Sequence, residues 1–150
     1  MQPNRHAPIC VVYYKTMKKL ITYTDGGARG NPGPAAIGVV VMDENKKEIE
    51  SFGKYIGHKT NNQAEYLALL AAVEKVRDMG ATEVTCYLDS ELVVKQMNRE
   101  YKVKNNELAS IFVKIWNVAT GFDRITYKHV RREQNKKADT QVNKALDNRS

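Results

Sequence analysis

Four carboxylates stand in stretches of sequence that are otherwise typical of a buried core. Asp25 follows the strand-like stretch LITYT, and Asp89 follows EVTCYL. Glu65 lies early in a helical stretch, on the side that carries its apolar residues, and Asp139 lies early in another. A buried carboxylate without a partner is costly or shifts its pKa, so these four residues call for an explanation.

Each carboxylate also has a structural explanation. Asp25 begins an Asp-Gly pair, which is common in turns. Glu65 could be the acid of a capping box, and Asp89 could cap the helix that starts near Ser90. Asp139 could complement a helix dipole. Taken singly, each of these explanations suffices.

Taken together, the four acids point to metal chemistry. Acids from four separate elements could converge at one end of a sheet, where without a cation they would repel one another. Mg²⁺ takes oxygen ligands and keeps waters and substrate phosphates in its shell. Two such ions about 4 Å apart can activate a water and stabilise a leaving oxygen. An acidic metal pocket in a basic protein is the combination expected of a nuclease.

Composition supports this interpretation and narrows the class of protein. The chain has 150 residues and a net charge of +7, which suits one domain with a polyanionic partner. Its two cysteines, Cys10 and Cys86, show no zinc-site spacing and fit a reducing, cytoplasmic compartment. No apolar run approaches the roughly 20 residues that span a bilayer.

The pattern of residues predicts an α/β fold. Residues 1–16 are expected to be a flexible leader, and residues 17–150 one catalytic domain. The expected strands are 20–24, 36–43, 48–57, 83–89 and 124–130, with a turn at 26–34. The expected helices are 60–80, 90–99, 107–122 and 135–148, the first capped by Asn61 or Asn62 and ended by Gly80. The first three strands form an antiparallel meander, and strands joined through helices pair in parallel, which gives a five-stranded mixed sheet. Sites in such sheets gather at carboxyl ends of strands.

The chain resembles type 1 ribonuclease H. Four stretches carry the resemblance in family order and spacing, from about Leu20 to Leu146: TDGGARGNPGPAAIG, TNNQAEYLALLAAV, LDSELVVKQMN and NKKADTQVNKA. The resemblance implies the ribonuclease H fold and cleavage of the RNA strand of RNA–DNA hybrids, with 5′-phosphate and 3′-hydroxyl ends. It places Asp25, Glu65, Asp89 and Asp139 on the four metal-binding acids of the family, holding two Mg²⁺ ions with substrate, or Mn²⁺ as a substitute.

The resemblance also implies which residues contact substrate. Small residues let the backbone approach closely, and polar groups can read the 2′-hydroxyl that distinguishes RNA from DNA. The candidates are the backbone of Gly26, Gly27 and Ala28, and the side chains of Asn61, Glu65 and Ser90. Asn31 and Thr60 match positions that hold a DNA-strand phosphate, although turn formation and helix capping explain them equally well. Asn62 is interpreted as structural.

Two features depart from the best-known family pattern. The interval between Val130 and Asn135 leaves no room for the histidine-bearing loop of many members. His129 is discounted because its strand pattern places it inside the last strand. Arg132 stands at the loop's place, where it could stabilise phosphate charge but could not act as a base.

The second departure is the absence of a long basic handle after QMN. Lys102 and Lys104 offer some charge, but grip on a hybrid is expected from Lys59, Lys95, Arg131 and Arg132. This predicts lower affinity with a steep salt dependence.

The sequence therefore predicts a monomeric, metal-dependent hybrid ribonuclease with no membrane association and no implied protein partner. One alternative is a catalytically silent nucleic-acid-binding domain on the same fold. Another is a related nuclease of resolvase or transposase type, although those would lack the TNNQAE helix start and the NPG turn.

Overall fold

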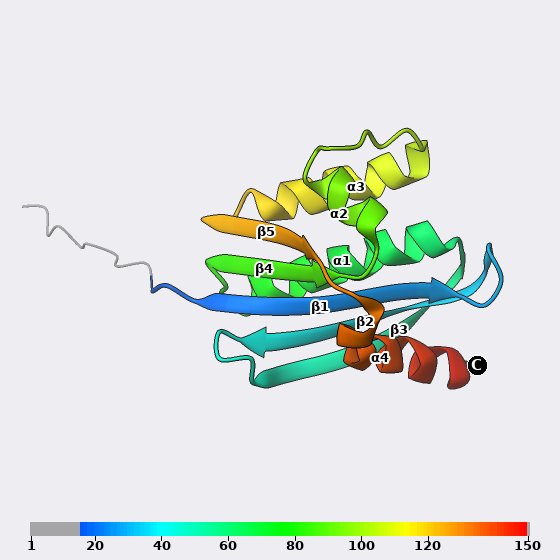
Figure 1. Cartoon of the computed structure of the whole chain (residues 1–150), viewed down its shortest axis with the longest axis horizontal. Coiled ribbons are helices and arrows are strands. Elements are labelled where there is room, and N and C mark those ends of the chain that lie inside the picture. Colours follow the sequence, from blue (N-terminus) through cyan, green and yellow to red (C-terminus); the bar gives the residue numbers. More distant parts are fainter. Residues whose placement is uncertain (1–15, 150) are drawn as a thin grey trace, which may run out of the picture.

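The computed structural model describes residues 16–149 and forms a sheet flanked by helices (Figure 1). The elements in chain order are β1 (Lys19–Ala28), β2 (Gly33–Asp43), β3 (Glu48–Lys59), α1 (Asn61–Asp78), β4 (Glu83–Leu88), α2 (Glu91–Met97), α3 (Asn106–Ala119), β5 (Arg124–His129), the 3₁₀ turn η1 (Arg132–Gln134) and α4 (Lys136–Asp147). Every strand and helix expected from the sequence is present, and η1 is the one element that was not predicted.

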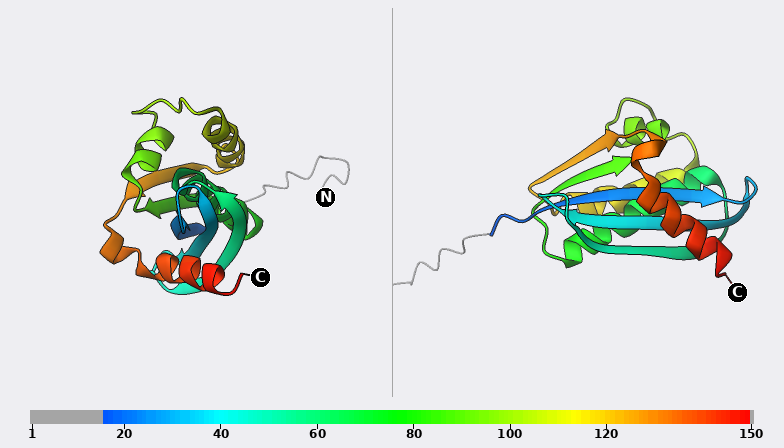
Figure 2. Two further views of the ribbon diagram at one scale, coloured as in Figure 1. Left: turned by 90° about the vertical axis from the view of Figure 1, so that its right-hand side faces the viewer. Right: turned by 60° about the horizontal axis from the view of Figure 1, so that its bottom comes forward.

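The five strands lie in the order β3-β2-β1-β4-β5. The pairs β1–β2 and β2–β3 are antiparallel, whereas β1–β4 and β4–β5 are parallel. This confirms the mixed sheet. Helix α1 packs on β1 and β2 and against α3, whereas α4 packs across β1, β2 and β3 on the other face (Figure 2).

The two faces of β2 are covered by different helices, which explains its nearly continuous apolar sequence. Val39 and Val41 belong to the main core with α1, whereas Ala36 packs with Val142 and Leu146 of α4. Gly38 allows α4 to lie directly on the strand, because a Cβ there would come 2.1 Å from the carbonyl oxygen of Ala138. This close packing fixes the helix that carries Asp139.

The turn predicted at 26–34 is wrong in its bounds. Gly26, Gly27 and Ala28 continue β1 and pair with Ile37, Ala36 and Ala35 of β2, so that only 29–32 lie between the strands. Glycine does not end a strand whose neighbour supplies hydrogen-bond partners. The parallel ladder with β4 nevertheless ends at Thr24 and Leu88. Asp25 and Asp89 therefore follow the last parallel pair, as expected.

The start of α1 also differs from expectation. Thr60, rather than Asn61 or Asn62, is the N-cap: its side chain accepts a hydrogen bond from the Gln63 N–H at 3.1 Å, and Gln63 Oε1 accepts one from the Thr60 N–H at 2.8 Å. The amide Gln63 thus completes the capping box, and Glu65 is free for another role. Gly80 follows the helix with a φ of 83°, as predicted.

Other expectations concern the leader, the cysteines and the membrane. The leader and Cys10 lie outside the described residues apart from Thr16. Cys86 is fully buried, and burial raises its pKa to about 12, so this thiol packs in the core rather than serving as a nucleophile. None of the helices within residues 16–149 is long and apolar enough to cross a membrane.

Candidate metal centre

Three of the four predicted acids meet at the carboxyl end of the parallel strands. Asp25 comes from β1, Glu65 from the second turn of α1, and Asp89 from the residue after β4. Each offers a carboxylate oxygen, and the three oxygens lie within 4.8 Å of one another. The sequence prediction that separate elements bring these acids together is met for this trio.

Glu65 is placed by a close crossing of α1 and β1. A Cβ on Gly26 would lie 2.2 Å from the backbone of Ala64, so only glycine permits this approach. The Gly26 N–H donates a hydrogen bond to Glu65 Oε1 at 3.1 Å. Glu65 is only 8% exposed, and its Oε2 is buried without a hydrogen-bond partner in the described structure. A buried, unpartnered carboxylate oxygen is the kind of group that a cation would satisfy.

Asp89 is held by Asn135, a residue that the sequence did not single out. The Asn135 side-chain amide donates to Asp89 Oδ2 at 3.0 Å and to the Thr24 carbonyl oxygen at 2.8 Å. Asn135 is 1% exposed although it lies between η1 and α4. It stands immediately before α4, where an asparagine often caps a helix, yet its side chain makes no cap hydrogen bond.

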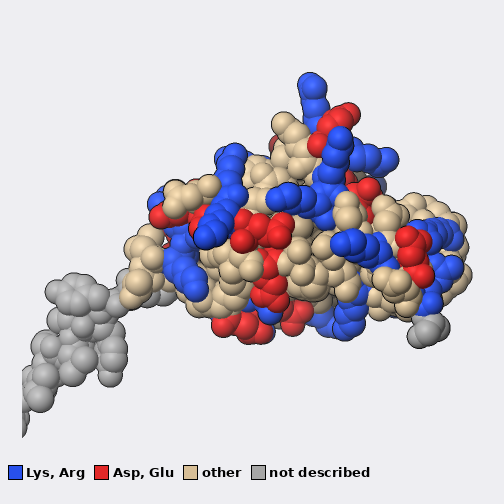
Figure 3. All heavy atoms as spheres, turned by 90° about the horizontal axis from the view of Figure 1, so that it is seen from below, with Lys and Arg blue, Asp and Glu red and all other residues tan. Residues whose placement is uncertain are grey.

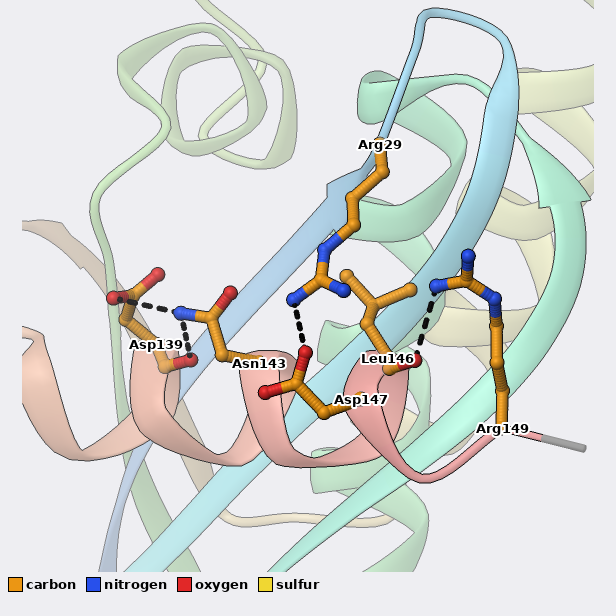
Figure 4. A network of polar contacts seen from close by, with 6 residues as sticks. All are labelled: Arg29, Asp139, Asn143, Leu146, Asp147 and Arg149. Carbon is orange, nitrogen blue, oxygen red and sulfur yellow. Dashed lines mark hydrogen bonds and ion pairs between the residues drawn. The ribbon is translucent and has the colours of Figure 1, made fainter.

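Asp139 lies in the first turn of α4, exposed, beside the trio rather than within it. It lines the same cavity as the other three acids. Asn143, one turn later, donates to Asp139 Oδ2 at 3.3 Å and to its carbonyl oxygen at 3.2 Å (Figure 4). Asp139 is thus the accessible member of the group.

The cluster is electrostatically unfavourable without a cation. The pKa of Asp25 is raised from 3.8 to about 7, chiefly by burial and then by the charge of Asp89; the adjoining Glu65 carboxyl opposes the shift, and Asp139 adds to it. Burial also raises the pKa of Glu65 well above its usual value, helped by the charges of Asp25 and Asp89. An all-oxygen donor set with excess negative charge fits a hard divalent cation such as Mg²⁺.

The chain matches known proteins over most of its length. A family model described as reverse transcriptase-like covers residues 23–145. Ribonuclease HI of Halobacterium salinarum is 42% identical over 125 residues, which cover 83% of this chain and 63% of that protein. Its crystal structure superposes with a TM-score of 0.85 at 40% identity over 87% of this chain and 99% of that one. The chain belongs to the type 1 ribonuclease H family. This confirms both the family resemblance and the fold.

Two further ribonuclease H relatives bear on function. The bifunctional protein Rv2228c of Mycobacterium tuberculosis is 42% identical over 130 residues, covering 86% of this chain but 36% of that protein. The chain thus spans about a third of that relative. LC11-RNase H1, solved in complex with an RNA/DNA hybrid, superposes with a TM-score of 0.82 at 45% identity, covering 85% of this chain and 96% of that one.

The cavity of this ribonuclease H chain has a volume of about 470 Å³ and gathers most of the predicted substrate residues. Besides the four acids, the cavity is lined by six residues that the sequence assigned to the site: Gly26, Gly27, Ala28, Asn61, Ser90 and Arg132. Asn31 and Thr60 instead line a neighbouring cavity of about 280 Å³, and Asn62 borders both.

The two cavities are joined by hydrogen bonds through Asn61. Its Oδ1 accepts from the Ala28 N–H at 2.9 Å, and its own N–H donates to Asn31 Oδ1 at 3.0 Å. The end of β1, the following turn and the start of α1 therefore form one wall. The sequence anticipated these residues but not the separation into two cavities.

Sequence reasoning also missed Arg29 and Asn143, which line the larger cavity. Arg29 is paired with Asp147 of α4 at 2.7 Å (Figure 4). Neither residue could be recognised from the sequence. Exposed arginines and asparagines are common, and only the fold brings these two to the cavity. Figure 3 shows Lys and Arg spread over one face of the molecule among groups of acidic side chains, rather than gathered in a single stripe.

The two loop-side candidates are also placed. His129 is the last residue of β5, as its strand pattern suggested, but its ring is exposed and its Nε2 lies 3.2 Å from the Asp89 carbonyl oxygen. It does not line the cavity, whereas the exposed Arg132 does.

Proposed function

We propose that this chain is a metal-dependent endoribonuclease that hydrolyses the RNA strand of RNA–DNA hybrids and leaves 5′-phosphate and 3′-hydroxyl ends. The observation that carries the proposal is the trio Asp25, Glu65 and Asp89, with carboxylate oxygens within 4.8 Å and one buried oxygen unpartnered. A pure nucleic-acid binder has no use for such a cluster beside a phosphate backbone. The hybrid-bound structure of LC11-RNase H1 supports the choice of substrate.

The metal ligands in this proposal are Asp25, Glu65, Asp89 and Asp139, with Asp25 shared between two Mg²⁺ ions and Mn²⁺ as a substitute. Bound ions would supply an activated water and stabilise charge on the leaving oxygen. The chain's own contribution is placement. Asn135 orients the Asp89 carboxylate, and the Gly26 N–H orients that of Glu65.

Recognition of the RNA strand is assigned to the wall formed by Gly26, Gly27 and Ala28 with Asn61 and Ser90. Backbone can approach a 2′-hydroxyl there because the side chains are absent or small. Asn61 Oδ1 is engaged by Ala28, which leaves its amide NH₂ as the group for substrate. Ser90 Oγ accepts from the Val93 N–H at 3.3 Å, so its hydroxyl proton can be donated.

We assign binding of the hybrid's phosphates to Arg132 in the cavity at the carboxylates, and to Asn31 and Thr60 in the smaller cavity. Arg132 would stabilise phosphate charge and takes no proton. Lys59 and Arg131 would strengthen binding of the hybrid. Lys95 contributes less than the sequence suggested, because it pairs with Glu91 at 3.0 Å and lies 5.0 Å from the Tyr101 ring centroid.

The experiment that tests this function is cleavage of a hybrid labelled separately on each strand, with duplex DNA and duplex RNA as controls, in Mg²⁺, Mn²⁺ or EDTA. The proposal requires metal-dependent loss of the RNA strand of the hybrid alone, with fragments that a ligase requiring 5′-phosphate and 3′-hydroxyl ends can rejoin. Tight hybrid binding without cleavage in either metal would favour the silent binding domain instead. Cleavage of duplex DNA would favour a resolvase-type nuclease.

We also propose a cytoplasmic monomer whose catalytic domain begins near residue 17.

A further inference from the structure

A stacked pair of tyrosines lies on the same face of the sheet as the carboxylates. Tyr23 precedes Asp25 by two residues, and Tyr87 precedes Asp89 by two, so each pair shares a side of its strand. Tyr23 and Tyr87 are direct partners in the parallel ladder, and their ring centroids lie 4.9 Å apart at an interplanar angle of 19°. Lys128 of β5 is the next partner in that row. The row formed by Tyr23, Tyr87 and Lys128 thus lies two residues along the strands, roughly 7 Å, from the positions of Asp25 and Asp89.

The face that carries this row is only partly covered. Helix α4 packs on β1, β2 and β3, and in Figure 1 the connection from β5 to α4 crosses β1 while β4 and β5 stay uncovered on that side. Both tyrosines are half-buried rather than enclosed. An aromatic pair that is left accessible beside a catalytic cluster is available to a flat ligand.

A third cavity, of about 340 Å³, opens beside Tyr23. Its charged lining residues are Lys46, Lys136, Lys137 and Glu133. Lys137 is paired with Glu48 at 3.6 Å, whereas the described structure records no ion pair for Lys46 or Lys136. The cavity therefore combines one aromatic ring with a net positive charge, and anions are its natural occupants.

Asn135 connects this cavity to the carboxylates. It lines the Tyr23 cavity while its amide nitrogen holds Asp89. Its Oδ1 is buried and has no hydrogen-bond partner in the described structure, which leaves an acceptor for a hydroxyl or amino group of a ligand.

We propose that the Tyr23 cavity binds an unpaired segment of the RNA strand, adjoining the hybrid held at the carboxylates. A base stacks on the Tyr23 ring, phosphates contact Lys46 and Lys136, and Asn135 Oδ1 accepts from the RNA. The ligand is single-stranded because a paired base within a duplex has no free face for a tyrosine. It is the RNA strand because the row adjoins the site where that strand is cut, so the assignment rests on the proposed function.

Binding is measured first without turnover. A fluorescent single-stranded RNA octamer is titrated in EDTA against the wild-type chain and Lys46→Gln/Lys136→Gln. The matched control is Lys114→Gln, an exposed lysine on α3, on the far side of the sheet. We expect the double variant to lose affinity, with the slope of log affinity against log salt smaller by about 1.4, since each phosphate contact on a single strand contributes about 0.7. The control should match the wild type.

Tyr23→Leu tests the stacking separately, with thermal melting to verify folding. It should weaken RNA binding at least about fivefold, the lower end of what base–aromatic stacking contributes. Equal affinity of the wild type, the double variant and the control would overturn the proposal. Equal affinity of the wild type for DNA of the same sequence would overturn the assignment to RNA.

Kinetics then separate this inference from the proposed function. For a hybrid with a single-stranded RNA extension, the double variant should show a raised KM, whereas for a blunt hybrid its KM and kcat should match those of Lys114→Gln. If the wild type fails to cleave the blunt hybrid, the proposed function fails whatever the octamer shows. If the blunt hybrid is cleaved and the extension changes nothing, only the RNA cavity is refuted.

Discussion

The side-chain amide of Asn135 joins Asp89 to the backbone of β1, donating at 3.0 Å to Asp89 Oδ2 and at 2.8 Å to the Thr24 carbonyl oxygen. One buried residue between η1 and α4 thereby ties the ends of both central parallel strands to the helix that carries Asp139. The carboxylates are held by their neighbours as much as by their own strands.

Asn135→Ala should weaken binding of Mg²⁺ and Mn²⁺ by about 10- to 100-fold, as loss of a group that orients a metal ligand generally does. It should also lower the free energy of unfolding by about 1–3 kcal/mol, because the Thr24 carbonyl oxygen and Asp89 each lose a buried hydrogen bond. Calorimetric titration and urea denaturation measure the two effects. Asn143→Ala is the matched control, since its bond to the exposed Asp139 is longer at 3.3 Å. Equal effects of both changes would contradict the role given to Asn135.

Stability without metal should fall as pH rises. The folded-state pKa of Asp25 is raised from 3.8 to about 7, so the folded chain holds a proton that the unfolded chain has released. Between these pH values the native state binds more protons, and its free energy of unfolding declines by up to about 4 kcal/mol on this account. Above about pH 7 the loss is complete. Glu65 adds to the effect in the same direction.

The measurement is urea denaturation in EDTA from pH 4 to 8. Asp25→Asn should flatten the dependence and make the metal-free chain more stable at neutral pH, because one like charge is removed. A stability that rises over this interval in the wild type would refute the electrostatic account of the cluster.

Gly26→Ala should damage both folding and the site. A Cβ there would lie 2.2 Å from the Ala64 backbone, so α1 must move away from β1. We expect a loss of about 1–3 kcal/mol in the free energy of unfolding, and weaker metal binding because Glu65 moves with the helix. Gly27→Ala is the control, since its Cβ would meet only Val142 Cγ1 at 3.7 Å. Similar stability of both variants would contradict the close crossing.

Substitution of Thr60 tests whether helix capping is the only role of this residue. Thr60→Ala removes the acceptor for the Gln63 N–H and should cost about 1 kcal/mol of stability. If Thr60 also holds a DNA-strand phosphate, the same change should raise KM for a hybrid several-fold, and Thr60→Ser should restore both quantities. A stability loss in Thr60→Ala with an unchanged KM would show that Thr60 acts only as a helix cap.

Much of this architecture could be read from the sequence, because strand and helix patterns and the four acids are local signals. The apolar face of α1 predicted that Glu65 points to the sheet, and the structure places it there, 8% exposed. The extension of β1 through Gly26–Ala28 could not be read, because it depends on pairing with β2. Nor could Asn135 or Arg29, whose roles depend on partners that lie 46 and 118 positions away in sequence.

The most direct test of the central claim is the rate of RNA-strand cleavage in a hybrid as a function of Mg²⁺ concentration, for the wild type and Asp25→Asn. Lys114→Gln serves as the control variant. We predict saturable, metal-dependent cleavage in the wild type and in the control, and a rate lower by orders of magnitude in Asp25→Asn at every Mg²⁺ concentration, while that variant remains folded. Near-normal turnover by Asp25→Asn would show that these carboxylates do not form the catalytic metal site.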